Sequence, residues 1–197
     1  MEIGVLALQG AFQEHRATLE KLGAKVREVR QVKDLDAIKG LVLPGGESTV
    51  QGKLLHELGL FDPLQKKIHD GLPVLATCAG LILLAQKLDQ DSTQHLATLP
   101  VTVKRNAFGR QSASFQAPIQ VGDLANFPAV FIRAPYITQM GLGVQVLARV
   151  EDKIVAVAYQ NQIGLAFHPE LSSDDRIHQA FLAKVASYSS KDSIVNQ

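Results

Sequence analysis

The sequence predicts an α/β protein with an open, mostly parallel sheet, helices on both faces and some antiparallel strands in the C-terminal half. In the first 85 residues, short apolar runs of the kind buried in parallel sheets alternate with segments of helical periodicity. Such alternation implies right-handed crossovers between parallel strands. From residue 99 to 147 the helical period disappears, and short β-type runs replace it.

The N-terminal half contains four expected strands, at residues 3–8, 25–29, 41–43 and 72–77. Helices are expected over 12–22, 50–58 and 62–70, and a fourth should begin at residue 79. Gly23, Gly59 and Gly71 follow the first three helices, as is typical of helix ends. The spacing of the second helix puts these residues on its apolar face: Val50, Leu54, Leu55 and Leu58.

The C-terminal half has β-type runs at residues 101–103, 118–121, 130–132 and 144–147. Residues 154–159 and 163–167 predict a hairpin joined by residues 160–162. A last helix should bury Ile177, Phe181, Leu182 and Val185. We see no linker, so we expect a single domain over residues 1–187 and a polar C-terminal tail over 188–197.

Composition excludes several functional classes. Twenty basic and nineteen acidic residues leave a formal charge of +1, and Trp is absent, which argues against nucleic acid as a partner. An anionic membrane is equally disfavoured, and no apolar stretch reaches membrane-spanning length. The single cysteine cannot form an intrachain disulfide. We therefore expect a cytoplasmic protein in a reducing compartment.

That cysteine, Cys78, lies between an apolar strand and an apolar helix. Gly80 permits a sharp bend as the helix begins. Such an elbow lifts one side chain to the carboxyl edge of the sheet, where α/β sheets bind ligands. The helix N-terminus there favours the thiolate, which is the nucleophilic form. The alternative is that a lone cysteine serves only as a small buried residue.

Among the six histidines, His168 has the context of a catalytic group. It ends an apolar strand, Pro169 keeps it extended, and Glu170 follows at a stiff spacing. Surface positions are expected for His56, His69 and His178. His95 lies in a polar loop, and the place of His15, on a helix face close to a strand end, stays open.

Cys78, His168 and Glu170 form a coherent catalytic triad in this chain order, because strand ends converge on one edge of an α/β sheet. The imidazole would take the thiol proton and later protonate a leaving amine, while the carboxylate fixes its tautomer. Acyl transfer also requires N–H donors for the oxyanion. The backbone N–H groups of Ala79 and Gly46 are candidates, although Gly45-Gly46 could be an ordinary turn. A phosphate loop is weaker, since no Gly-Lys-Ser/Thr follows.

Six segments in order resemble the class I (triad) glutamine amidotransferases, and within that class the glutaminase subunits of pyridoxal 5′-phosphate synthase. They span most of the chain and read LALQGAFQEH, LVLPGGEST, TCAGLILLA, RNAFGRQSASF, IRAP and FHPEL. The resemblance implies hydrolysis of L-glutamine to glutamate and ammonia through a cysteine thioester, with Cys78, His168 and Glu170 as the triad. It also implies a substrate-binding set consisting of Gly46, Glu47, Ser48, Arg105, Ile132 and Arg133.

The resemblance further implies that ammonia passes to a barrel-shaped synthase subunit in a hetero-oligomer, and that this partner switches on the glutaminase. The turn at Gln9-Gly10 and its helix would belong to the docking side. Pyridoxal phosphate would be a product of the complex, so the chain itself needs no cofactor and no metal. Two alternatives stay open at this point: a peptidase- or deglycase-like enzyme with a cysteine elbow, and an inactive docking subunit.

Overall fold

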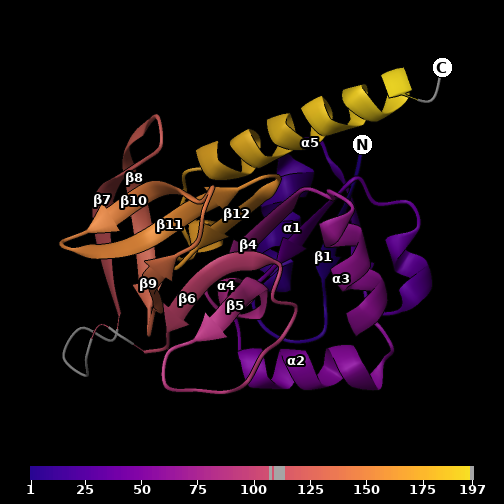
Figure 1. The fold of residues 1–197 in the computed structure, drawn as a ribbon. Coiled ribbons are helices and arrows are strands. Elements are labelled where there is room, and N and C mark those ends of the chain that lie inside the picture. Colours follow the sequence, from indigo (N-terminus) through magenta and orange to yellow (C-terminus); the bar gives the residue numbers. More distant parts are fainter. Residues whose placement is uncertain (107, 109–113, 196–197) are drawn as a thin grey trace.

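The computed structural model describes residues 1–106, 108 and 114–195, which form one large sheet, a two-stranded sheet and flanking helices (Figure 1). The large sheet has ten strands in the order β2-β1-β3-β4-β12-β11-β9-β6-β5, with β10 paired to β11. Its first five strands in this order are all parallel: β2 (Lys25–Val29), β1 (Glu2–Leu6), β3 (Gly40–Leu43), β4 (Val74–Thr77) and β12 (Gln162–Leu165).

The C-terminal half adds the antiparallel part of this sheet. The predicted hairpin is confirmed as β11 (Lys153–Tyr159) paired antiparallel with β12. The remaining strands are β10 (Gln145–Val150), β9 (Tyr136–Met140), β6 (Leu99–Lys104) and β5 (Ala85–Leu88). All of these pairings are antiparallel except that of β5 with β6. The predicted fold class is therefore confirmed.

The described residues contain five α-helices, which cover the sheet: α1 (Phe12–Lys21), α2 (Ser48–Glu57), α3 (Phe61–His69), α4 (Ala79–Leu84) and α5 (Arg176–Val195). In Figure 1, α5 and α2 lie on opposite sides of the sheet. The approach of α5 is close, because a Cβ atom on Gly40 of β3 would lie 2.6 Å from Val185 Cγ2. The small residue therefore lets α5 pack directly on the central strands.

The second sheet pairs β7 (Ser114–Val121) with β8 (Leu124–Ile132) in antiparallel register. Phe115 and Phe131 stack across the two strands with ring centroids 4.6 Å apart. Phe131 in turn contacts Phe167, the residue before His168, at 5.5 Å. Because the backbone N–H of His168 also donates to Val130 O (2.8 Å), this small sheet fixes the end of the strand that carries the catalytic histidine candidate.

The buried face of α2 differs from the prediction. Val50 and Leu58 are 44% and 46% exposed, whereas Gln51 and Gly52 are buried. Gln51 Nε2 donates to Gln9 O (3.0 Å) and Pro44 O (3.2 Å), so the helix turns a polar side chain inward to satisfy two loop carbonyls. Hydrogen bonding of those buried backbone groups outweighs the burial of two apolar side chains.

The last helix also differs from the prediction, since α5 continues to Val195 through the segment expected to be a polar tail. Its continuation is anchored by Tyr188, whose hydroxyl donates to Asp70 O (3.4 Å) and whose ring lies against Gly71. The division into a domain over 1–187 and a tail over 188–197 stays a prediction.

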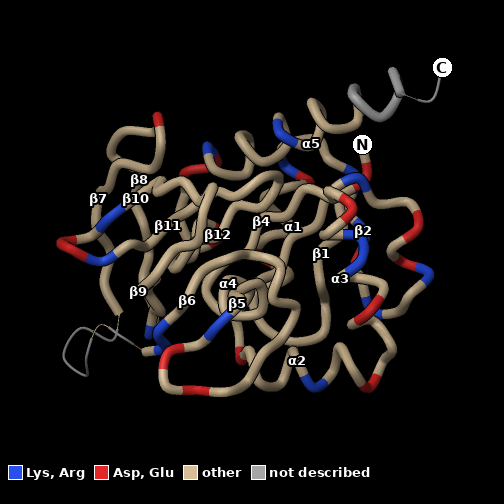
Figure 2. Tube along the Cα trace, viewed as in Figure 1, with Lys and Arg blue, Asp and Glu red and all other residues tan. Residues whose placement is uncertain are grey.

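Charges are interspersed along the chain, with acidic and basic residues alternating around the visible trace (Figure 2). In the part of the chain that the structure describes, no helix is both long and apolar enough to cross a membrane.

Candidate active site

A strand–turn–helix elbow joins β4 to α4 at Cys78. The residue has φ 50° and ψ −103°, a strained conformation for a side chain with a Cβ atom. Its N–H donates to Leu165 O of β12 (2.8 Å), which holds the turn against the neighbouring strand. Gly80 is required for the bend, because a Cβ atom there would lie 2.1 Å from Leu43 O of β3. The predicted elbow therefore forms, and Cys78 is 9% exposed.

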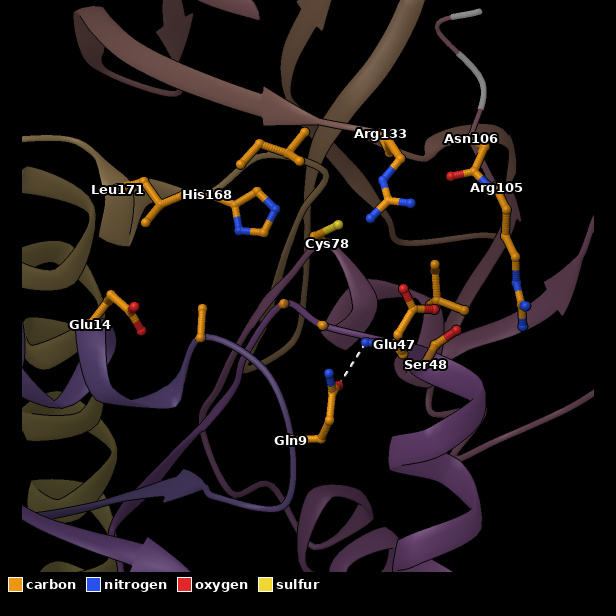
Figure 3. A pocket seen from close by; sticks show the side chains of 15 residues that line it. Gln9, Glu14, Glu47, Ser48, Cys78, Arg105, Asn106, Arg133, His168 and Leu171 are labelled. Atoms are coloured by element: carbon orange, nitrogen blue, oxygen red, sulfur yellow. Dashed lines mark hydrogen bonds between the residues drawn. The ribbon is translucent and has the colours of Figure 1, made fainter. Parts of the chain in front are cut away.

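His168 and Glu170 lie beside this thiol at the end of β12. His168 Nδ1 is 2.7 Å from Glu170 Oε1, and both residues are 7% exposed. Pro169 starts the short 3₁₀-helix (Pro169–Leu171) that turns the carboxylate back to the imidazole. Since Nδ1 is bound to Glu170, His168 Nε2 is the nitrogen that can serve Cys78. In Figure 3, the Cys78 side chain lies between His168 and Arg133.

The charge state of His168 follows from these neighbours. Burial by itself lowers its pKa, but hydrogen bonds to Cys78 and Glu170 outweigh this effect and raise the pKa to about 10. The pKa of Glu170 is lowered, because His15 and His168 together outweigh the opposing effect of burial. At neutral pH the site therefore favours the protonated form of His168, the imidazolium.

The Gly45-Gly46 turn after β3 lies directly against the pair. A Cβ atom on Gly45 would be 2.4 Å from His168 Cε1 and 3.5 Å from Cys78 Cβ. Gly45 O accepts from Ala11 N (3.0 Å), which directs this carbonyl toward α1. Because C=O and N–H point in opposite directions in a trans peptide, the Gly46 N–H is directed away from α1.

Gln9 braces the same turn from the loop after β1. Glu47 N donates to Gln9 Oε1 (2.7 Å), and a Cβ atom on Gly46, whose φ is 151°, would lie 2.4 Å from that oxygen. Gly10 is equally constrained, because its φ is 96° and a Cβ atom there would meet Gly45 O at 1.9 Å. These contacts explain why both Gly46 and Gly10 must be glycine.

A cavity of about 520 Å³ opens over Cys78. It brings together most of the site residues predicted from the sequence, namely Gly46, Glu47, Ser48, Cys78, Arg105, Ile132, Arg133 and His168. Glu170 lies behind His168, and Ala79 is buried at the start of α4. Part of the RNAFGRQSASF segment, residues 107 and 109–113, lies outside the described residues.

The chain matches the profile of the SNO glutamine amidotransferase family over residues 5–187. It belongs to this family. Two similar proteins are both named pyridoxal 5′-phosphate synthase subunit PdxT. The one from Desulfitobacterium hafniense (strain Y51) is 59% identical over 187 residues, covering 94% of each chain. The one from Methanocorpusculum labreanum is 52% identical and covers 94% of this chain and 98% of its own.

Solved structures agree with this membership. A crystal structure described as a glutamine amidotransferase superimposes with a TM-score of 0.89 at 44% identity, over 93% of this chain and 98% of its own. A putative GMP synthase subunit from Thermoplasma acidophilum has a TM-score of 0.70 at 19% identity, and this likeness concerns the fold alone. Membership of the SNO family decides against the peptidase-like and deglycase-like alternatives.

The far end of the pocket carries opposite charges. Glu47 and Arg133 both project into the cavity in Figure 3. Neither forms an ion pair with another described residue. A carboxylate and a guanidinium without ion pairs beside Cys78 are suited to an amino-acid ligand with charged α-amino and α-carboxylate groups.

One histidine is not where the sequence predicted it, since His178 was expected on the surface but is fully buried. His95 lies in the loop between β5 and β6, as predicted, but is only 7% exposed. The apolar spacing of α5 contained the signal, because His178 precedes Phe181 by three residues and Val185 by seven, on the same helix face. His15 is also fully buried, with Nε2 3.3 Å from Glu170 Oε2. Sequence reasoning left its role open.

Proposed function

We propose that this chain is the glutaminase subunit of a pyridoxal 5′-phosphate synthase, hydrolysing L-glutamine to L-glutamate and ammonia. The observation that carries the proposal is the presence of Cys78 and His168 in one pocket, with Glu170 behind His168 and its carboxylate 2.7 Å from His168 Nδ1. The relatives named above supply the pathway, since both carry the name of this synthase subunit.

In the proposed reaction, His168 first takes the proton of the Cys78 thiol. The Cys78 thiolate attacks the side-chain amide carbon of glutamine, and the carbonyl oxygen becomes an oxyanion. The His168 imidazolium gives its proton to the amide nitrogen, so that ammonia leaves and a thioester remains. Neutral His168 then takes a proton from water, whose oxygen attacks the thioester. Collapse of this second intermediate releases glutamate and restores the thiolate and the imidazolium.

Backbone N–H groups would stabilise both oxyanions. In our proposal these are the N–H of Ala79, at the start of α4, and the N–H of Gly46, which the hydrogen bond from Ala11 to Gly45 O turns away from α1. Glu47 would bind the α-ammonium group of glutamine and Arg133 its α-carboxylate. Ser48, Arg105 and Ile132 would complete the binding pocket.

Ammonia would pass to a barrel-shaped synthase subunit within a hetero-oligomer, which uses it to build pyridoxal phosphate. The Gln9-Gly10 turn supports gating by such a partner, because its contacts with Gly45 and Gly46 set the peptide orientation in the oxyanion site. A partner that moves this turn would change glutamine hydrolysis directly. A catalytic thiol also needs a reducing compartment, so the proposal places the protein in the cytoplasm.

The test is release of glutamate and ammonia from glutamine by the full chain, with and without the synthase. We expect hydrolysis to rise strongly when the synthase is present, and Cys78→Ala to abolish it while still assembling with the synthase. Hydrolysis by Cys78→Ala at the wild-type rate would reject the nucleophile. A folded wild-type complex without any hydrolysis would favour the inactive docking subunit instead.

A further inference from the structure

A chain of buried polar side chains continues from Glu170 away from the pocket. It consists of His15 of α1, His178 of α5 and Thr77, the last residue of β4, none of which has exposed surface. Glu170 Oε2 lies 3.3 Å from His15 Nε2, which is also 3.2 Å from Thr77 Oγ1. His15 Nδ1 is 2.9 Å from His178 Nε2. These three residues do not line the cavity, so they can affect the reaction only through the triad.

Both imidazoles of this chain are neutral. Burial lowers the pKa of His15, aided by the charge of His168 and opposed by Glu170 and Glu14. Burial lowers the pKa of His178 to about 3 against the opposing charges of Glu170 and Asp175. At neutral pH each ring therefore carries a single N–H.

The geometry then restricts where the two protons lie. Only one proton fits between His15 Nδ1 and His178 Nε2. If His178 holds it, the proton of His15 must be on Nε2, where it faces Glu170 Oε2. The opposite arrangement turns a lone pair of His15 toward the carboxylate and leaves a buried N–H on His178 Nδ1, which has no partner among the described residues. The first arrangement avoids both costs.

The carboxylate needs this donor. His168 occupies Glu170 Oε1, whereas Glu170 Oε2 is buried without a hydrogen-bond partner among the described residues, and His15 Nε2 lies 3.3 Å from it. A buried carboxylate oxygen without a donor is unfavourable, and a carboxylate held at one oxygen alone can rotate. A donor at Oε2 therefore fixes the plane of the carboxylate relative to the His168 ring.

We propose that His15 is a positioning residue for the triad, donating from Nε2 to Glu170, and that His178 fixes the tautomer of His15. This inference rests on the glutaminase function proposed above. With the carboxylate fixed, His168 keeps its Nε2 directed at Cys78. Loss of the His15 contact should reduce the rate of the chemical steps and leave glutamine binding unchanged, because His15 does not reach the pocket.

Two substitutions of His15 separate its two contacts. The amide nitrogen of His15→Gln takes the place of Nε2 and can still donate to Glu170, whereas that of His15→Asn takes the place of Nδ1 and cannot. For the complex with the synthase, we expect His15→Asn to lower kcat about 10–100-fold at unchanged KM for glutamine. His15→Gln should recover most of this loss. His69→Asn, on the exposed side of α3, is the matched control and should keep wild-type kinetics.

Titration of His168 is the readout that a purely structural role would not move. In the full chain with ¹³C-labelled histidine, the pKa of His168 should fall in His15→Asn and recover in His15→Gln, because the ion pair with Glu170 weakens only in the former. Unchanged kcat and His168 titration in His15→Asn would overturn the proposal. Equal losses of kcat in well-folded His15→Asn and His15→Gln would also overturn the proposal.

A measurement on the unsubstituted chain removes any dependence on the folding of variants. The ¹⁵N shifts of the imidazole nitrogens report the tautomers directly, and we expect the Nε2–H form for both His15 and His178. An Nδ1–H form of His15 would reject the proposal. If the wild-type complex hydrolyses no glutamine, the proposed function fails, while the titration and tautomer of the histidines still decide whether His15 orients Glu170.

Discussion

The two arginines at the far end of the pocket have different surroundings. Arg105 Nη1 contacts Thr49 Oγ1 at 3.4 Å, and its Nη2 lies 3.7 Å from Asp91 Oδ2. Arg133 has φ 42° and forms no ion pair with another described residue, so its guanidinium is available to a ligand. A positive φ in a non-glycine residue is strained, and here it directs a charged side chain into the pocket.

This difference predicts unequal effects on glutamine binding. Arg133→Ala should raise the KM for glutamine about 10–100-fold, because the variant loses one charge-assisted hydrogen bond to a carboxylate. Arg105→Ala should also raise KM, but less, because part of its charge is already compensated by Asp91. Steady-state kinetics of the complex measure both values.

Arg149→Ala on the exposed face of β10 is the control and should leave KM unchanged. An unchanged KM in Arg133→Ala would remove that residue from the binding set. A larger effect in Arg105→Ala would mean that glutamine displaces its contacts with Thr49 and Asp91.

Among the secondary-structure elements, the position of α4 determines the geometry of Cys78, the proposed nucleophile. The helix has only six residues, and its first residue, Ala79, carries one proposed oxyanion donor. It packs on β3 so closely that a Cβ atom on Gly80 would lie 2.1 Å from Leu43 O and 2.9 Å from Leu43 Cβ. The contact atoms belong to a buried strand, so they cannot move aside as the end of a flexible side chain can.

Gly80→Ala should therefore displace the start of α4. We expect kcat to fall strongly, because Cys78 and the Ala79 N–H move together, and the free energy of unfolding to fall by about 1–3 kcal/mol through overpacking. Chemical denaturation and glutaminase assays measure the two effects. Gly59→Ala is the control, since its φ of 66° brings strain of about 1–2 kcal/mol but a Cβ atom there meets nothing within 4 Å. Wild-type kcat in Gly80→Ala would show that α4 adapts without moving the nucleophile.

At the scale of the whole molecule, the sequence predicted the elements whose patterns are local and strong. The parallel strands β1, β3 and β4 are uninterrupted apolar runs, and the elbow at Cys78 follows from their order. Strands β5 and β9 were missed, because each is short and exposes polar residues, so neither shows a clear period. Their pairing depends on partners distant in the sequence.

The candidate site likewise contains some residues that the sequence could predict and others that it could not. Cys78, His168 and Glu170 could be predicted, because breakers and proline mark their strand ends. His15 and His178 could not be paired from the sequence, since they are 163 residues apart and meet only when α1 and α5 pack on the same side of the sheet. Full burial of this histidine pair depends on the complete tertiary structure, and local periodicity in the sequence carries no information about it.

This buried pair predicts how the stability of the whole molecule depends on pH. The pKa of His178 is about 3 in the folded chain, against about 6.5 in an unfolded chain. Between these values the unfolded state binds more protons, so stability is present above pH 6.5 and is lost as pH falls toward 3. The contribution is about 1.4 kcal/mol for each pH unit in this window.

His178→Gln removes the titrating group and keeps an amide donor for His15 Nδ1. We expect the free energies of unfolding of the wild type and this variant to be similar at pH 7. At pH 4.5 the wild type should have lost about 2–3 kcal/mol more than the variant, as measured by denaturant titration at both pH values. His69→Gln, at an exposed position, should follow the wild type at both pH values.

Equal losses of unfolding free energy in His178→Gln and the wild type would mean that His178 takes up its proton without unfolding. The polar chain from His178 to Glu170 would then tolerate a charge, and the neutral tautomers assigned to it would have to be revised.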